Sequence, residues 1–151
     1  MRPKSALVLT VSDRVAAGTR EDASGEAIAQ RLSALGFAVE RRLVPDEVPA
    51  IAGAIRDGAG AHPLIVSTGG TGLTPRDVTP QATRTVLDYE VPGIAEAMRA
   101  AGRVHTPLAD LSRGLVGVVG RSLVINVPGS PKGSLESLDA VVPILDHLFG
   151  S

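Results

Sequence analysis

Residues 62–83 read HPLIVSTGGTGLTPRDVTPQAT, in which a short apolar run leads through a glycine-rich segment to a proline. The apolar run, over residues 62–70, predicts a buried β-strand. Thr79 and Pro80 then predict a helix start, with the threonine as N-cap and the proline at the first helical position. This helix is expected to reach about Glu90. A strand, a loop and a helix in this order form one repeating unit of a parallel α/β sheet.

The segments on both sides of this stretch repeat the alternation. Further strands are predicted at residues 5–12 and 37–44, and residues 114–129 predict two strands hinged at Gly120 and Arg121. Helices are predicted at residues 22–35, 48–59 and 92–102, and over the closing segment from Leu135 to Phe149, which Pro143 can kink. The pattern predicts an α/β fold: a three-layer, mostly parallel twisted sheet with helices on both faces and one short antiparallel strand. The length of 151 residues fits a single domain over residues 1–151.

The composition excludes several classes of function. Aromatic residues make up only 2% of the chain and its net charge is -1, so neither base stacking nor a polyanionic nucleic-acid partner is expected. The absence of cysteine excludes disulfides and thiolate metal sites, and it is compatible with the cytoplasmic location that we expect. No run approaches the roughly 18 apolar residues of a membrane span. The first apolar run predicts a strand rather than a signal peptide, because Asp13 and Arg14 stand where a cleavage site would be required.

Polar residues follow each of the predicted parallel strands. They are Ser12 and Asp13, then Pro45, Asp46 and Glu47, then the glycine-rich loop, and finally residues 126–130. Ligands of doubly wound sheets bind beyond the carboxyl ends of the strands, where loops and helix N-termini converge. The sequence therefore predicts that these four loops line one crevice.

The glycine-rich loop has the composition of an anion-binding loop. Gly69, Gly70 and Gly72 let a ligand approach bare N–H groups, and the neighbouring threonines add hydroxyl donors. A phosphate group above a helix N-terminus would suit it, although neither GxxxxGK[ST] nor GxGxxG is present. The alternative is that the glycines only make turns and that Asp77 caps the following helix.

Acidic residues in two of the loops predict a Mg²⁺ site. Such a site needs one or two carboxylates, substrate phosphate oxygens and several waters. Asp46 and Asp77 are the candidates, and Asp13 or Glu47 could replace either. Two alternatives stay open: Asp46 as a helix N-cap, and Asp13 as the partner of the adjacent Arg14. The three histidines are scattered and GxSxG is absent, so zinc or serine-hydrolase chemistry has no support.

Six motifs together resemble one family. They are TVSDR at 10–14, VPDE at 44–47, STGGTGLTPRDVTPQAT at 67–83, VPGIAEAMR at 91–99, TPLADLSR at 106–113 and INVPGSP at 125–131. In this order they are similar to the molybdopterin adenylyltransferases, the Mog type of molybdenum-cofactor biosynthesis proteins, which also occur as the G domain of gephyrin. The resemblance implies transfer of AMP from Mg-ATP to the terminal phosphate of molybdopterin, with release of pyrophosphate. It also implies a homotrimer or dimer of trimers, and a molybdate-inserting enzyme as a possible partner.

The resemblance also assigns roles to residues. Asp46 matches the aspartate of the PDE motif and Asp77 that of the RDVT motif, which implies that both are catalytic and bind the metal. The residues expected to contact substrate are Ser12, Asp13, Gly69, Gly70, Thr71, Gly72, Arg76, Thr79, Ser112, Ser122, Asn126, Pro128, Gly129 and Ser130. Arg76 could neutralise charge that develops in phosphoryl transfer, or it could anchor the loop through an aspartate.

Two other functions remain as alternatives. A non-catalytic module could use the same crevice to hold pterin or nucleotide within an oligomer. A nucleotide-cleaving enzyme is a third option, because related domains occur in competence-damage proteins, which usually carry an additional domain.

Overall fold

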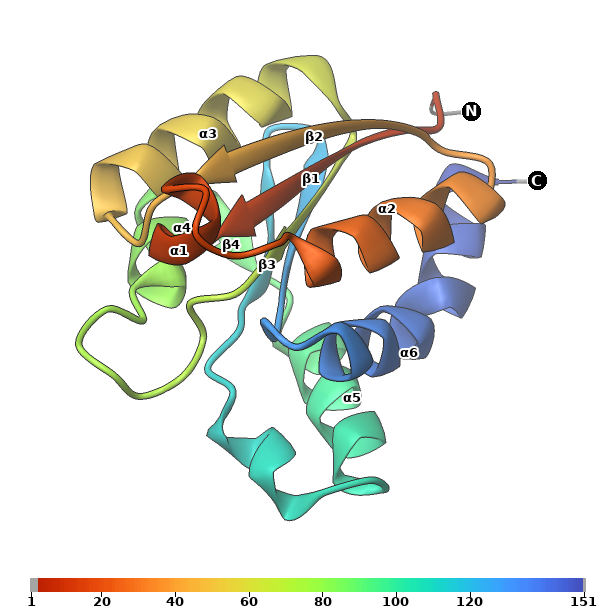
Figure 1. The fold of residues 1–151 in the computed structure, drawn as a ribbon. Coiled ribbons are helices and arrows are strands. Elements are labelled where there is room, and N and C mark those ends of the chain that lie inside the picture. Colours follow the sequence, from red (N-terminus) through yellow and green to blue (C-terminus); the bar gives the residue numbers. More distant parts are fainter. Residues whose placement is uncertain (1–2, 151) are drawn as a thin grey trace.

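The computed structural model describes residues 3–150, in which six strands form one mixed sheet in the order β2-β1-β3-β6-β5-β4 (Figure 1). The strands are β1 (Ser5–Val11), β2 (Ala38–Val44), β3 (Leu64–Thr68), β4 (Tyr89–Glu90), β5 (Val116–Val119) and β6 (Ser122–Val127). β2, β1, β3 and β6 are parallel, whereas β5 is antiparallel to both β6 and β4. β5 is thus the short antiparallel strand that the sequence predicted.

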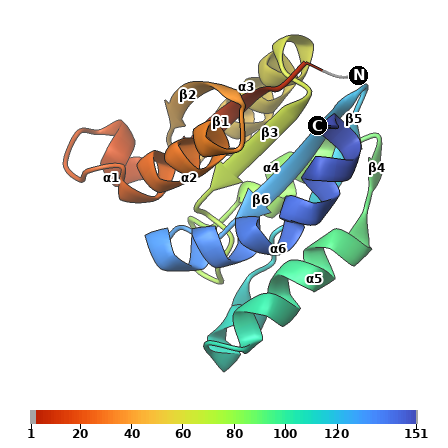
Figure 2. The same cartoon turned by 90° about the vertical axis from the view of Figure 1, so that its right-hand side faces the viewer.

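Helices cover both faces of the sheet and complete the predicted three layers. They are α1 (Asp13–Ala16), α2 (Ala23–Ala34), α3 (Val48–Ala61), α4 (Thr79–Val86), α5 (Pro92–Arg103), the 3₁₀ helix η1 (Pro107–Leu111) and α6 (Pro131–Phe149). α2, α5 and α6 pack on the face shown in Figure 2, and α3 and α4 pack on the opposite face. Val8 joins the first of these cores and the adjacent Leu9 joins the second, so β1 is buried on both sides.

The strand register brings the functional loops to one edge. Val8, Val66 and Ile125 lie side by side on β1, β3 and β6. Two residues later, Thr10 lies beside Thr68, which lies beside Val127. The segments that follow these strands therefore leave the sheet at the same level, as predicted. No helix within residues 3–150 has the length and apolar character that crossing a membrane requires.

The segment after the glycine-rich loop differs from its prediction. The predicted helix to about Glu90 ends at Val86, and Tyr89–Glu90 forms β4. Backbone N–H groups on both sides of this strand bond to β5, from Asp88 to the Val118 carbonyl at 2.8 Å and from Val91 to the Val116 carbonyl at 2.7 Å. Hydrogen bonding to β5 overrides the local helical pattern. A strand of two residues is too short to be recognised from the sequence.

One expectation about a helix start also needs correction. Val78 rather than Thr79 occupies the N-cap of α4, and Thr79 is the first helical residue. Its side chain is fully buried and donates a hydrogen bond to the Gly69 carbonyl at 2.9 Å instead of capping the helix. α6 continues through Pro143 as a single helix from Pro131 to Phe149.

Candidate active site

Two cavities lie at the carboxyl edge of the parallel strands. The first, of about 300 Å³, is bounded by the ends of β1, β2 and β3 and the start of α2, and is called here the polar cavity. The second, of about 440 Å³, lies between the glycine-rich loop, α5, η1 and the start of α6, and is called the apolar cavity. Four residues line both: Gly70, Asp77, Gly129 and Ser130. Two ligands could therefore meet at this shared boundary.

The glycine-rich loop runs unusually close to its neighbours. Gly69 and Gly70 have φ values of +100° and +70°, which favour glycine. A Cβ atom on Gly69 would lie 2.4 Å from the Val11 carbonyl oxygen, and one on Gly70 would lie 2.2 Å from the Thr79 hydroxyl oxygen. The hydrogen bond from Thr79 to the Gly69 carbonyl closes the turn from within. These two glycines are therefore required by the backbone, whatever the loop binds.

Asp46 and Asp13 are joined by a reciprocal pair of hydrogen bonds. The Asp13 N–H donates to Asp46 Oδ2 at 2.9 Å, and the Asp46 N–H donates to Asp13 Oδ1 at the same distance. Asp46 is thus not the N-cap of α3, a position that Glu47 takes without a side-chain hydrogen bond. Asp13 pairs with Arg76 rather than with the adjacent Arg14, through Nε and Nη2 at 3.0 Å each. Arg76 was expected either to neutralise charge in phosphoryl transfer or to anchor the loop through an aspartate. The structure shows the contact with an aspartate.

The environment gives these two carboxyl groups opposite pKa shifts. Burial raises the pKa of Asp46. The hydrogen bond from the Asp13 N–H lowers this pKa, and the negative charges of Asp13 and Asp77 raise it. Hydrogen bonds from Arg76, and then from the Asp46 N–H, lower the pKa of Asp13. Asp13 therefore keeps its charge neutralised by Arg76, whereas the charge on Asp46 is disfavoured until a cation approaches.

Asp77 is oriented by its own loop. Its Oδ2 atom accepts hydrogen bonds from the Thr74 N–H at 2.9 Å and the Thr74 hydroxyl at 2.8 Å. It therefore fastens a turn within the loop and does not cap α4, whose N-cap is Val78. The Oδ1 atoms of Asp46 and Asp77 accept no hydrogen bond from residues 3–150. Both residues line the polar cavity, so each can offer one oxygen to a ligand there.

This donor set fits a magnesium ion that shares its coordination with phosphate and water. Within residues 3–150 no group of three or more His, Cys, Asp or Glu side chains could hold a metal ion. Magnesium usually takes one or two protein carboxylates and fills the remaining positions with waters and substrate phosphates. The two free Oδ1 atoms match that requirement. A cation beside Asp46 would favour its ionised form, which burial and the charges of Asp13 and Asp77 disfavour.

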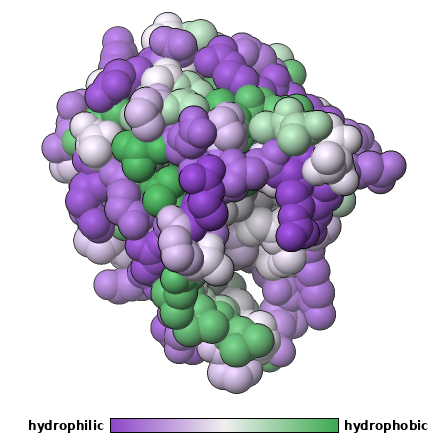
Figure 3. All heavy atoms as spheres, turned by 60° about the vertical axis from the view of Figure 1, so that its left-hand side comes forward, coloured by the Kyte–Doolittle hydropathy of each residue, from purple (hydrophilic) through white to green (hydrophobic). Residues whose placement is uncertain are grey.

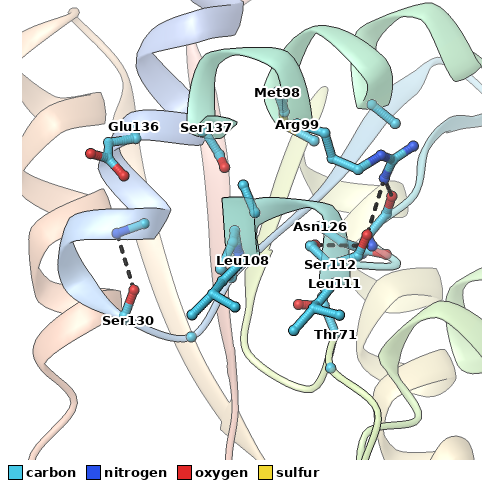
Figure 4. A pocket seen from close by; sticks show the side chains of 18 of the residues that line it. Thr71, Met98, Arg99, Leu108, Leu111, Ser112, Asn126, Ser130, Glu136 and Ser137 are labelled. Carbon is cyan, nitrogen blue, oxygen red and sulfur yellow. Dashed lines mark hydrogen bonds between the residues drawn. The ribbon is translucent and has the colours of Figure 1, made fainter. Parts of the chain in front are cut away.

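The apolar cavity is walled by side chains from α5 and η1. Met98 on α5, Leu108 and Leu111 on η1, and Thr71 on the glycine-rich loop line it (Figure 4). Arg99 turns away from its centre to donate to the carbonyls of Ser112 and Gly114 at 3.4 and 3.2 Å, which ties α5 to the segment after η1. In the space-filling view, a hollow lies above a group of apolar residues at the end of the molecule where η1 lies (Figure 3).

The family model described as "Probable molybdopterin binding domain" matches residues 7–147. The chain belongs to this family. A curated relative, the molybdopterin adenylyltransferase of Helicobacter pylori strain J99, is 40% identical over 147 residues, which cover 93% of this chain and 82% of the relative. The protein of the same name from Haemophilus influenzae is 42% identical over 89% of this chain and 71% of the relative.

Solved structures of family members have the same fold. The molybdopterin biosynthesis enzyme MoaB of Thermus thermophilus is 50% identical and superimposes with a TM-score of 0.87, over 97% of this chain and 93% of that one. A MogA structure gives a TM-score of 0.91 at 43% identity, with 95% of each chain covered. The family resemblance and the α/β fold expected from the sequence are therefore confirmed.

Most residues expected to contact substrate lie at the two cavities. Ser12, Gly69, Gly70, Gly129 and Ser130 line the polar one, and Gly70, Thr71, Gly72, Ser112, Asn126, Pro128, Gly129 and Ser130 line the apolar one. Asn126 is nevertheless engaged within the protein. Its amide donates to Ser67 and Thr83, and its Oδ1 atom accepts from the Leu115 N–H at 3.0 Å.

The remaining predicted residues do not line either cavity. Asp13 and Arg76 form the ion pair behind Asp46, and Thr79 is buried beneath the loop. Ser122 lies at the opposite end of the sheet, because it is the first residue of β6 whereas the cavities follow the last. Its hydroxyl donates to the carbonyls of Ala59 and His62 at 3.1 and 2.6 Å. Ser122 thus joins β6 to the end of α3 and is not brought to the candidate site.

Several residues that line or support the cavities were not predicted from the sequence. Thr10 and Asp22 line the polar cavity and are joined to each other by a 2.8 Å hydrogen bond. Met98 lines the apolar cavity. In the sequence it was only one residue of a predicted helix, and nothing indicated that it would line a cavity. Arg113, directly after the predicted Ser112, donates to carbonyls of the glycine-rich loop. A basic residue beside an expected substrate contact was the available signal for Arg113.

Proposed function

We propose that this chain is a molybdopterin adenylyltransferase that transfers AMP from Mg-ATP to the terminal phosphate of molybdopterin and releases pyrophosphate. Two curated bacterial relatives with that enzyme name are 40% and 42% identical to it. The observation that carries the proposal is the position of Asp46 and Asp77. Each has an oxygen that accepts no hydrogen bond from residues 3–150. Both lie at the polar cavity, which shares a boundary with a second cavity.

The two cavities suit a reaction between two phosphate-bearing substrates. One substrate in each cavity would place its phosphates near the shared residues Gly70, Gly129 and Ser130. Ser130 is also the N-cap of α6, accepting the Gly133 N–H at 3.1 Å, so the positive end of a long helix faces the same region. Helix N-termini favour negative charge by typically about 0.3 to 1 kcal/mol at exposed positions.

The chemistry follows from this arrangement. An oxygen of the molybdopterin phosphate attacks the α-phosphorus of ATP, and the bond from that phosphorus to the bridging oxygen breaks, so that pyrophosphate leaves with the electron pair. Asp46 and Asp77 would hold Mg²⁺, which neutralises charge on the ATP phosphates when bound. The backbone N–H groups of the glycine-rich loop would hold the phosphates in line. Arg76, paired with Asp13, supports the loop and leaves direct charge neutralisation to the metal and these amides.

The test combines purified protein, Mg-ATP and molybdopterin, and follows both adenylylated product and pyrophosphate. Asp46→Ala and Asp77→Ala are each expected to lower kcat by about 10²- to 10³-fold, the cost of removing one element of charge stabilisation. Asp57→Ala is the matched control, since the Asp57 side chain is 77% exposed and remote from both cavities. Unchanged turnover in both site variants would overturn the assignment, and no product from the intact protein would favour a non-catalytic binding module.

A further inference from the structure

Arg113 holds the glycine-rich loop at several points. The loop joins β3 to α4 through residues 69–78, and Arg113 follows η1 on the neighbouring segment. The Arg113 backbone N–H donates to the Thr71 carbonyl at 2.9 Å. Its guanidinium donates from Nε to the Gly72 carbonyl at 2.9 Å and from Nη2 to the Asp77 carbonyl at 2.7 Å. One side chain therefore bonds to both ends of the segment that carries Asp77.

Among residues 3–150, few other contacts hold that part of the loop. Leu73, which lies between Gly72 and Asp77, is 67% exposed and belongs to neither of the two apolar cores. The turn itself is closed by the Asp77 carboxylate on Thr74 and by the Asp77 N–H, which donates to the Thr74 carbonyl at 3.0 Å. These bonds fix the shape of the turn but not its place on the molecule. Its place is set by Arg113 on one side and by the Arg76 ion pair with Asp13 on the other.

The guanidinium group suits this task because its donors form a rigid, planar fork. Within residues 3–150 Arg113 makes no ion pair, and its Nη1 atom donates only to Gln81 on α4 at 3.4 Å. Its guanidinium therefore donates to two loop carbonyls and to the helix that follows the loop. A lysine ammonium keeps the charge but has no fork that spans two fixed carbonyls.

We propose that Arg113 is a positioning residue that holds the Asp77 loop so that Asp77 stays beside Asp46 at the polar cavity. The inference deepens the proposed function and rests on it, because Asp77 matters there as a magnesium ligand. Arg113 touches neither substrate nor metal in this role. A small displacement of a reacting group can lower the rate by about 10²-fold. Loss of the Arg113 hydrogen bonds to the loop is therefore expected to affect catalysis without unfolding the protein.

The test uses Arg113→Lys in the full chain, with Arg103→Lys as the matched control. Arg103 makes an ion pair with Asp110 at 2.6 Å, also near η1, but contacts no residue of the loop. Hydrogen exchange of the peptide covering residues 69–78, and Mn²⁺ binding in the absence of substrates, are measured at a temperature where all variants are folded. Arg113→Lys is expected to exchange at least about ten-fold faster in this peptide and to bind Mn²⁺ about ten-fold more weakly. Arg103→Lys is expected to match the wild type in both.

Turnover adds a third measurement. The half-saturating Mg²⁺ concentration should rise and kcat should fall by about ten-fold or more in Arg113→Lys. Loop exchange and Mn²⁺ affinity equal to those of the wild type would overturn the proposal, even if the melting temperature fell. If Arg113→Lys does not fold, Arg113→Gln, which keeps a single donor group, is measured in the same way. If the intact protein makes no adenylylated product, the proposed function fails, but exchange and Mn²⁺ binding still decide the role of Arg113.

Discussion

At the scale of single residues, the proposed metal ligand Asp46 carries a cost to stability. Its pKa is raised by burial and by the charges of Asp13 and Asp77, so its ionised form is disfavoured in the folded protein. A carboxyl group with a raised folded pKa stabilises the fold below its unfolded pKa, and this contribution is lost as the pH rises through the folded pKa. At neutral pH the ionised group therefore destabilises the protein until a cation binds.

Asp46→Asn should separate these two effects. The amide oxygen can still accept the Asp13 N–H, while the repulsion from Asp13 and Asp77 disappears. In EDTA at pH 7 the variant is expected to melt at the wild-type temperature or above it. Mg-ATP should raise the melting temperature of the wild type but not that of the variant. A lower melting temperature for Asp46→Asn in EDTA would show that the carboxylate stabilises the fold, contrary to this account.

The roles of single residues were also the hardest feature to predict from the sequence. Asp46 and Asp77 could be chosen because carboxylates after two parallel strands must lie at one edge of the sheet. Ser122 was assigned to the site by the family resemblance alone, although the predicted hinge at Gly120 and Arg121 already put it at the start of a strand, the end away from the loops. The contacts of Arg113 with Gly72 and Asp77 join residues far apart in sequence, and no local pattern indicates them.

At the scale of elements, the turn after β3 is the most constrained part of the fold. Gly70→Ala would put a Cβ atom 2.2 Å from the Thr79 hydroxyl oxygen, at a φ of +70°. Such backbone strain typically costs about 1 to 3 kcal/mol. We expect urea denaturation to show a loss of this size, together with loss of AMP transfer, because the turn also sets the loop amides.

Gly53→Ala is the control for this substitution. Gly53 lies within α3, and a Cβ atom there would meet no atom of residues 3–150 within 4 Å. Alanine in a helix interior is favoured over glycine by roughly 0.5 to 1 kcal/mol, so this variant should be more stable and fully active. Equal stability of Gly53→Ala and Gly70→Ala would mean that the turn is not strained as described.

Most elements could be predicted because their patterns are long. The run from Ser5 to Val11 is buried almost throughout, and α6 presents its apolar residues at helical spacing. β4 could not be predicted, because Tyr89–Glu90 is too short to show alternation and is defined by its bonds to β5. An element could thus be predicted when its own sequence determines it, and could not be predicted when a distant partner determines it.

At the scale of the whole molecule, we expect a homotrimer or a dimer of trimers. Large apolar side chains are exposed on the single chain, including Leu73 at 67%, Tyr89 at 61% and Val104 at 81%. Burial of such side chains between copies is a common reason for their exposure in an isolated chain. Light scattering should give three or six times the chain mass of 15.5 kDa. A monomer at every concentration used in the enzyme assay would contradict this expectation.

We propose that Asp46 and Asp77 bind one divalent cation together with the phosphates of ATP. The most direct test of this proposal is a crystal structure with Mn²⁺ and a non-hydrolysable ATP analogue, in which anomalous scattering locates the metal. We predict a single peak in the polar cavity, about 2.0 to 2.2 Å from the Oδ1 atoms of both residues and coordinated by phosphate oxygens. A metal bound to the analogue but away from either carboxylate would contradict it.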